Sequence, residues 1–140
     1  MDRRRFLRTA CQACAALAVA PAVASLESCA STQATSYAVQ DGALRIPLNS
    51  LTQGVNIVRA KGLSYKLMIN KRPDGSYTAL VLNCPHKSGP VNFTDGDGLK
   101  CAWHGSTFDL EGKVTKGPSK QDLKRYPVTV EGDQLRVAVG

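Results

Sequence analysis

Two short segments that each carry a cysteine and a histidine constrain this chain most strongly. The segment "CPHKSGP" contains Cys84 and His86, and "CAWHGSTFD" contains Cys101 and His104. The chain has only two histidines, and three of its five cysteines lie in the first 29 residues. The way the fold places these two segments relative to each other therefore decides what kind of site they form. Two thiols and two imidazoles suit a structural zinc, an iron–sulfur cluster, a thiol nucleophile with its base, or a disulfide.

The spacing of these four residues separates the alternatives. It reads C-x-H, fourteen residues, then C-x-x-H. Zinc sites with two cysteines and two histidines usually use C-x₂₋₄-C and H-x₃₋₅-H spacing, whereas each segment here supplies one of each type. This interleaving favours a centre of two irons, one bound by thiolates and one by imidazoles. A disulfide would leave both histidines unexplained, a thiol enzyme would use one pair only, and a structural zinc domain used for binding is the alternative function.

The rest of the chain after residue 42 has the pattern of short β-strands. Apolar and polar residues alternate in "ALRIPL" and "VNIVRA", and "NKRPDG" separates two further strand-like runs. No stretch there has a convincing helical period. We therefore expect an all-β fold, a small antiparallel sandwich or barrel. The expected strands are 43–48, 55–60, 64–69, 76–82 and 99–102, followed by hairpins around 109–114 and around 131–133.

The N-terminal segment resembles an export signal. Residues 1–29 combine a basic start, an alanine-rich run and small residues, and "RRRFLR" resembles the twin-arginine motif, although Asp2 stands where that motif usually has Ser or Thr. The apolar run 9–24 is shorter than the roughly 20 residues of a membrane-spanning helix, which disfavours a retained anchor. Cleavage is expected after Ala24 or before Cys29, where "LESC" resembles a lipoprotein box.

This signal sets the expected organisation and location. Residues 30–42 read as a polar tether, and residues 43–140 as the folded domain. Export through the twin-arginine route would deliver an already folded protein to the periplasm or cell envelope. Lipidation at Cys29 would hold the domain at a membrane surface without crossing it.

The basic charge of the chain does not indicate nucleic-acid binding. The formal net charge is +7. Four arginines and two acidic residues lie in the first 29 residues, so the rest carries 14 basic and nine acidic side chains, a net charge of +5. The lysines are scattered, with no basic helix or aromatic-interleaved patch. A moderately basic face would instead steer an acidic redox partner.

The segments "CPHKSGPV" and "CAWHGSTFDLEGKVTKGPS" resemble the two cluster-binding boxes of Rieske iron–sulfur proteins, and the similarity runs from about Cys84 to Val130. The resemblance implies a Rieske-like β fold in which two loops form a cluster-binding lobe. It also implies one 2Fe–2S cluster with Cys84 and Cys101 on one iron, and His86 and His104 on the other. Neutral imidazoles in place of two thiolates raise the reduction potential, to about −150 to +300 mV in such centres.

The resemblance also assigns tuning roles near the cluster. Gly89 and Gly105 would let backbone N–H groups approach the sulfides. Ser106 stands where high-potential Rieske proteins place a serine hydroxyl against a sulfide. Phe108 stands where they often have a tyrosine that donates to a cysteine sulfur. We therefore expect an intermediate-to-high potential, below that of the quinol-oxidising subunits.

Two further features concern how the cluster is covered. Gly117 and Pro118 match the Gly-Pro loop that covers the cluster in the family. Rieske subunits of quinol–cytochrome c reductases usually carry an extra cysteine in each box, which form a disulfide. The corresponding residues here are Gly89 and Trp103, so we expect no bridge, and we expect Trp103 to pack beside the cluster and shield it.

These features together predict an exported one-electron transfer protein or subunit. The four protein ligands would leave no open coordination site for a substrate on either iron. Any enzymatic activity would therefore belong to a partner. The expected partner is a cytochrome, a quinol–cytochrome c reductase, or the catalytic subunit of an oxidase such as arsenite oxidase. Rieske ferredoxins of ring-hydroxylating oxygenases share the fold but work in the cytoplasm, which the export signal disfavours.

Overall fold

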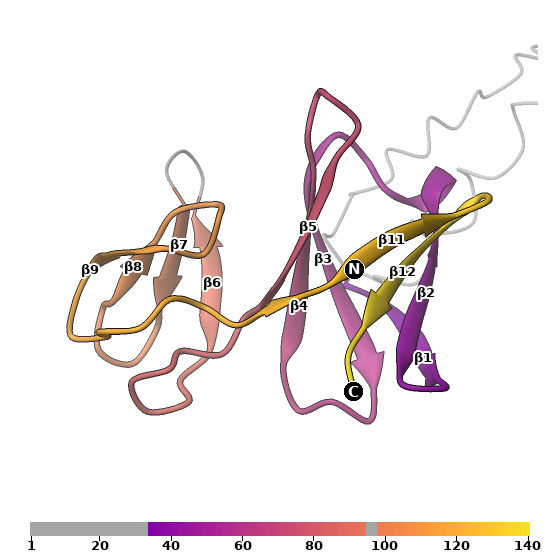
Figure 1. Cartoon of the computed structure of the whole chain (residues 1–140). Coiled ribbons are helices and arrows are strands. Elements are labelled where there is room, and N and C mark those ends of the chain that lie inside the picture. The colour runs from indigo at the N-terminus through magenta and orange to yellow at the C-terminus, as the bar shows by residue number, and fades with distance from the viewer. Residues whose placement is uncertain (1–33, 95–97) are drawn as a thin grey trace, which may run out of the picture. The chain divides into compact units, whose positions relative to one another are not determined.

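The structure, a computed structural model, describes residues 34–94 and 98–140, and this part of the chain is almost entirely β (Figure 1). It contains twelve strands and one 3-10 turn, η1 (Leu48–Ser50). The expected all-β class is confirmed. Among the described residues, no helix has the length and apolar character needed to cross a membrane. The expected export signal and Cys29 lie outside the described residues.

The larger sheet curls into a nearly closed barrel. Its strand order is β10-β5-β4-β3-β1-β2-β12-β11, with antiparallel neighbours except for the parallel pair β1 and β3. β10 and β11 lie at opposite ends of this order, yet only Pro127 separates them along the chain. The two ends of the sheet are therefore held close together. The strands are β1 (Thr35–Gln40), β2 (Ala43–Pro47), β3 (Gly54–Lys61), β4 (Lys66–Lys71), β5 (Tyr77–Val81), β10 (Arg125–Tyr126), β11 (Val128–Glu131) and β12 (Gln134–Ala138).

The barrel begins earlier in the chain than the sequence predicted. Residues 30–42 were expected to form a polar tether, but Thr35–Gln40 form β1. This strand pairs with β2 on one side and with β3 on the other. Its side chains are mostly exposed or half-buried, so it shows little of the apolar alternation that marks the other strands. The folded domain therefore includes residues 35–40.

The second sheet is an insertion between β5 and β10. Its four strands are antiparallel and follow chain order, β6-β7-β8-β9. Together with the loops between β5 and β10 it forms the cluster lobe, defined here as residues 82–94 and 98–124. The strands are β6 (Val91–Thr94), β7 (Gly98–Cys101), β8 (Thr107–Phe108) and β9 (Val114–Lys116).

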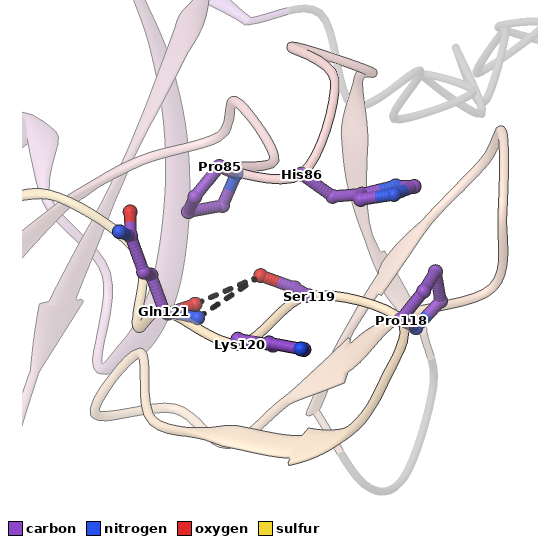
Figure 2. Close-up of a pocket in the computed structure, with 6 residues that line it drawn as sticks. All are labelled: Pro85, His86, Pro118, Ser119, Lys120 and Gln121. Atoms are coloured by element: carbon purple, nitrogen blue, oxygen red, sulfur yellow. Dashed lines mark hydrogen bonds between the residues drawn. The ribbon is translucent and has the colours of Figure 1, made fainter.

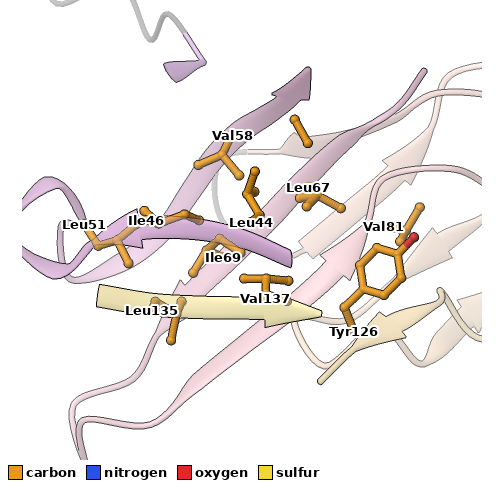
Figure 3. Close-up of a cluster of buried hydrophobic side chains, with 12 residues drawn as sticks. Leu44, Ile46, Leu51, Val58, Leu67, Ile69, Val81, Tyr126, Leu135 and Val137 are labelled. Atoms are coloured by element: carbon orange, nitrogen blue, oxygen red, sulfur yellow. The ribbon is translucent and has the colours of Figure 1, made fainter. Parts of the chain in front are cut away.

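Two cores share the strands β4 and β5, because alternate residues of a strand point to opposite faces. Leu67 and Ile69 enter the barrel core, whereas Met68, between them, enters a second core under the lobe. Burying each such side chain contributes about 1.5–3 kcal/mol. Figure 3 shows the barrel core. Its buried members are Leu44, Ile46, Leu51, Val58, Ala60, Leu67, Ile69, Ala79, Val81, Tyr126, Leu135 and Val137.

Polar contacts also tie the lobe to the barrel. The Glu111 carboxylate pairs with Arg72, which follows β4, and with Arg125 of β10. Arg125 also donates to the backbone oxygen of Glu111 at 2.6 Å. Exposed ion pairs contribute little individually, so the shared apolar core is the stronger attachment.

Most strands follow the predicted pattern. β2, β3, β4, β5 and β7 overlap the predicted strands, and β8–β9 and β11–β12 form the predicted hairpins. The prediction missed β1, β6 and β10. β10 has two residues and β6 four, too short for an alternating pattern to stand out.

A tyrosine pair joins the turn before β4 to β10 and yields a test of the barrel. The hydroxyls of Tyr65 and Tyr126 lie 2.6 Å apart. This hydrogen bond is the main cause that raises the pKa of Tyr65, followed by burial. Since the pKa in the folded state exceeds the unfolded value of about 10, the stabilisation is complete below pH 10 and is lost as the pH rises through the folded pKa.

We therefore expect Tyr65→Phe to lower the free energy of unfolding by about 0.5–1.5 kcal/mol at pH 7. The difference from wild type should shrink above about pH 10. Urea unfolding at a series of pH values measures both effects. Tyr77→Phe is the matched control, because the Tyr77 side chain packs on the barrel core and makes no hydrogen bond to a described residue. Equal losses in the two variants would contradict the role of the pair.

Candidate metal centre

The first loop of the site, residues 83–90, is closed by its own backbone. Cys84 N–H donates to the Gly89 oxygen and Ser88 N–H to the Cys84 oxygen, each at 2.8 Å. Asn83 and Pro90 form an isolated bridge across the base of the loop. This closure buries the Cys84 side chain at 1% exposure and leaves His86 at the exposed tip.

The second loop follows β7 and has a similar plan. Cys101 ends the strand, and its N–H donates to the Ser106 oxygen at 2.8 Å, while Gly105 N–H donates to the Cys101 oxygen at 3.2 Å. Gly105 has a φ of +74°, a left-handed conformation that glycine adopts without steric cost. The turn buries Cys101 and leaves His104 exposed.

The two loops meet directly. Ala102 N–H in the second loop donates to the Pro90 oxygen in the first at 2.9 Å. The Trp103 ring lies over Gly89, where an added Cβ would come within 2.9 Å of Trp103 Cδ2 and 3.1 Å of Cys101 Sγ. Only glycine fits this position without displacing a neighbour.

This meeting of the loops sorts the four sequence-predicted ligands into two pairs. The free thiols of Cys84 and Cys101 are both buried, and they lie close enough for each to shift the pKa of the other. The exposed rings of His86 and His104 have centroids 5.0 Å apart and cross at 86°. Within the described ranges, no three His, Cys, Asp or Glu residues surround a single point as ligands of one metal ion would. The site thus has a thiol side and an imidazole side.

The electrostatic surroundings of the two thiols differ. Burial is the main cause that raises the pKa of Cys84, opposed by the His86 backbone N–H. Burial acts in the same direction on Cys101. There the backbone N–H groups of His104 and Trp103, together with Cys84, outweigh it and lower the pKa. The loops therefore turn N–H donors toward sulfur, which favours thiolate, the form that binds metals.

A third segment, residues 117–121, is tied to these loops. The N–H of Ser119 donates to the buried Ser106 Oγ at 2.9 Å. The Ser106 hydroxyl also acts to lower the pKa of the Cys84 thiol, against the larger raising effect of burial. Figure 2 shows a pocket of about 310 Å³, with Pro85 and His86 on one side and this segment on the other. The Gly-Pro segment is thus positioned beside the first loop, and Ser119 is a positioning residue that the sequence pattern did not reveal.

The remaining residues predicted to tune the cluster differ in their surroundings. The Gly105 N–H donates to a carbonyl, and the N–H groups that reach sulfur belong to His86, Trp103 and His104. Trp103 does pack between the loops through Gly89, but 59% of it remains exposed. Phe108 is buried in the core beneath the loops.

The donor set suits a binuclear iron–sulfur centre. Two adjacent thiols with N–H donors nearby fit one iron with its sulfides, and two adjacent imidazoles fit the other. A family model described as the Rieske [2Fe-2S] domain matches residues 47–127. The chain belongs to this family. One Rieske-type 2Fe–2S cluster is therefore its cofactor.

Individual relatives of this Rieske chain come from two settings. It is 43% identical over 71 residues to the ferredoxin component of the p-cumate 2,3-dioxygenase system of Pseudomonas putida, covering 48% of this chain and 60% of that protein. It is 39% identical over 54 residues to the cytochrome b6-f complex iron-sulfur subunit of Synechococcus sp. (strain JA-3-3Ab), covering 38% of this chain and 31% of the subunit. It therefore spans less than two thirds of either relative.

A solved structure supports the fold. A chain of a hyperthermophilic respiratory Complex III has a TM-score of 0.53 and 23% identity, with 65% of this chain and 71% of that chain covered. At this level of identity the likeness concerns the Rieske fold alone.

The contact between Gly89 and Trp103 can be tested by substitution. We expect Gly89→Ala to destabilise the holoprotein by about 1–3 kcal/mol and to lower its iron content, because the added methyl group meets the base of the Trp103 ring and Cys101 Sγ. Thermal unfolding and iron analysis measure the two effects. Gly117→Ala is the matched control, since its Cβ would meet no atom closer than 3.8 Å. Equal behaviour of the two variants would show that the close approach is unimportant.

Proposed function

We propose that this chain is an exported one-electron carrier, or a carrier subunit, in which Cys84 and Cys101 hold one iron and His86 and His104 the other. The observation that carries the proposal is the division of the site into buried thiols and exposed imidazoles. When bound, the cluster supplies reversible one-electron oxidation and reduction. The protein's part is to insulate one side of the centre and to present the other to a partner.

The surroundings of the thiols support a centre that accepts an electron readily. Backbone N–H groups of His86, Trp103 and His104, and the Ser106 hydroxyl, act to lower the pKa of the neighbouring thiols. Such donors stabilise the more negative, reduced form of a centre and raise its potential. The four protein ligands leave no position for a substrate, so we assign chemical conversion to the partner.

Among the described residues, the cluster lobe carries six lysines against three carboxylates. Its described carboxylates are engaged: Asp109 and Asp122 accept backbone N–H groups, and Glu111 pairs with arginines. Lys87 and Lys120 are exposed and form no ion pair with a described residue. Both lie in segments that flank His86. We propose that the partner is a redox protein, such as a cytochrome or an oxidase catalytic subunit, with an acidic docking surface.

The proposed location rests on the N-terminal sequence. The twin-arginine-like motif and the sequence "LESC" support export to the periplasm or cell envelope, with Cys29 as the proposed site of lipid attachment. The relatives' names include both a cytochrome complex subunit and a dioxygenase ferredoxin. The export motif favours a partner in or at the membrane over a cytoplasmic oxygenase.

Metal analysis of the mature protein tests the ligand assignment. We expect about two irons and two acid-labile sulfides per chain, and after reduction an electron paramagnetic resonance signal with the low average g of histidine-ligated clusters. Cys84→Ser and His104→Ala should each lose the signal, because each removes a ligand. Lys87→Gln, next to His86, should keep it. One zinc per chain without sulfide would instead support the alternative of a structural zinc domain.

Electrostatic docking predicts a salt-dependent reaction with an acidic cytochrome. The second-order rate constant for electron transfer, measured by stopped flow, should fall as ionic strength rises. Lys87→Gln and Lys120→Gln should each lower it roughly twofold to threefold at low salt, because they remove attraction during the encounter. Lys71→Gln, at the end of β4 and outside the segments that flank His86, makes the same change of charge and is the control. A rate that does not depend on salt would contradict the docking proposal.

A further inference from the structure

A second pocket, of about 280 Å³, lies where β3 and β4 meet the first loop of the site. The barrel side supplies residues 59 and 64–66, and the lobe side supplies residues 82–83, 88 and 90–92. No Asp or Glu among the described residues lines it. We call this space the junction pocket; its lining residues are Arg59, Ser64, Tyr65, Lys66, Leu82, Asn83, Ser88, Pro90, Val91 and Asn92.

Two positive side chains face each other in the junction pocket. Arg59 and Lys66 are direct partners in the antiparallel register of β3 and β4. Directly opposite residues project from the same face of a sheet, with Cβ atoms about 4.5–5.5 Å apart, and like charges placed in this way destabilise the pair. A negative group bound between Arg59 and Lys66 would offset this repulsion and stabilise the pair.

Arg59 also differs from the other arginines in the described ranges. Arg45, Arg72, Arg125 and Arg136 each form an ion pair with Glu111 or Glu131. Arg59 forms none with any residue that the structure describes.

The other polar side chains of the pocket also have few hydrogen-bond partners among the described residues. None makes a side-chain hydrogen bond to a described residue, except that the Tyr65 hydroxyl binds Tyr126. Arg59 and Lys66 only donate, and the hydroxyl and amide groups beside them can donate. Two cationic donors and several neutral donors that line one pocket, with no carboxylate among its described residues, match an oxyanion, for which arginine offers a planar fork. The polar side chains that have no side-chain partner among the described residues are Arg59, Ser64, Lys66, Asn83, Ser88 and Asn92.

We propose that the junction pocket binds an oxyanion of the phosphate or sulfate class, with Arg59 and Lys66 as its charged ligands. The volume of the pocket accommodates a small tetrahedral anion or the phosphate of a lipid headgroup. The two sources share the same chemistry, and the experiment below separates them.

The site would also affect the redox centre; this second part rests on the proposed function. Asn83 and Ser88 belong to the loop that holds Cys84, and Ser88 N–H donates to the Cys84 oxygen. A bound anion at this position disfavours the reduced centre, which carries one more negative charge. Binding is reciprocal, so reduction weakens anion affinity by the factor by which the anion disfavours reduction.

Titration of the holoprotein with inorganic phosphate tests the binding site, with chloride used to keep the ionic strength constant. We expect saturable binding by calorimetry and a melting temperature that rises with phosphate. Arg59→Gln and Lys66→Gln should each weaken binding about tenfold, the loss of a charge-assisted hydrogen bond. Lys71→Gln, at the other end of β4, has the same change of net charge and should bind as wild type.

Phosphatidylglycerol vesicles without inorganic phosphate form the second arm. Binding of free phosphate identifies a soluble anion, and vesicle binding alone, lost in Arg59→Gln and Lys66→Gln, identifies a lipid headgroup. No binding in either arm, or equal weakening in Lys71→Gln, overturns the proposal.

A third measurement addresses the link to the centre. Phosphate should lower the reduction potential of wild type more than that of Arg59→Gln. An unchanged potential alongside saturable binding overturns only the link. A protein without a cluster would refute the proposed function, while the binding data would still decide the pocket.

Discussion

The burial of two thiols side by side is the constraint on which the rest of this structure depends. Cys84 and Cys101 belong to the same buried cluster as Met68 of β4 and Leu80 of β5. The outer face of the barrel is therefore the floor of the metal site, and β4 and β5 must be apolar on both faces to serve two cores. This explains why these strands are buried almost throughout, unlike the half-exposed strands of many antiparallel sheets.

With the two thiols buried, the loops must hold the two imidazoles at the exposed surface, and no disulfide joins one loop to the other. The structure meets this requirement with short-range contacts: each loop closes on its own cysteine, and Ala102 N–H joins them through the Pro90 oxygen. Trp103 covers Gly89 at the place where the resemblance would have put a disulfide. A hydrogen bond and an aromatic contact each contribute only about 1 kcal/mol, so we expect metal ligation to add to the order of the loops. Ser106 adds a further connection, because its hydroxyl accepts the Ser119 N–H and so joins the segment after Gly117 and Pro118 to the second loop.

The sequence was sufficient for features that depend on local pattern, and insufficient for those that depend on register. Alternating residues revealed most strands, and the paired Cys and His residues indicated which side chains would come together. β1 was missed because its apolar residues Tyr37 and Val39 are only half-buried and the strand is held largely by pairing with β2 and β3. The pairing of Arg59 with Lys66 could not be predicted either, because only the β3–β4 register places this arginine and this lysine opposite each other. The N–H of Ser119 could not be anticipated either, because backbone donors are set by the path of the loop and not by residue type.

The distribution of charge gives these separate features a common electrostatic basis. Among the described residues of the cluster lobe, lysines outnumber carboxylates and Glu111 is paired with arginines, so lysines and Arg59 make the field around the first loop positive. The same positive field stabilises the reduced centre, which carries an added electron, and attracts negatively charged groups. Any anion that approaches, whether a partner's carboxylate at the exposed tip or an oxyanion in the junction pocket, therefore weakens the stabilisation of the reduced centre. On this argument, docking of an acidic partner promotes release of the electron, because it neutralises the charges that helped to hold it.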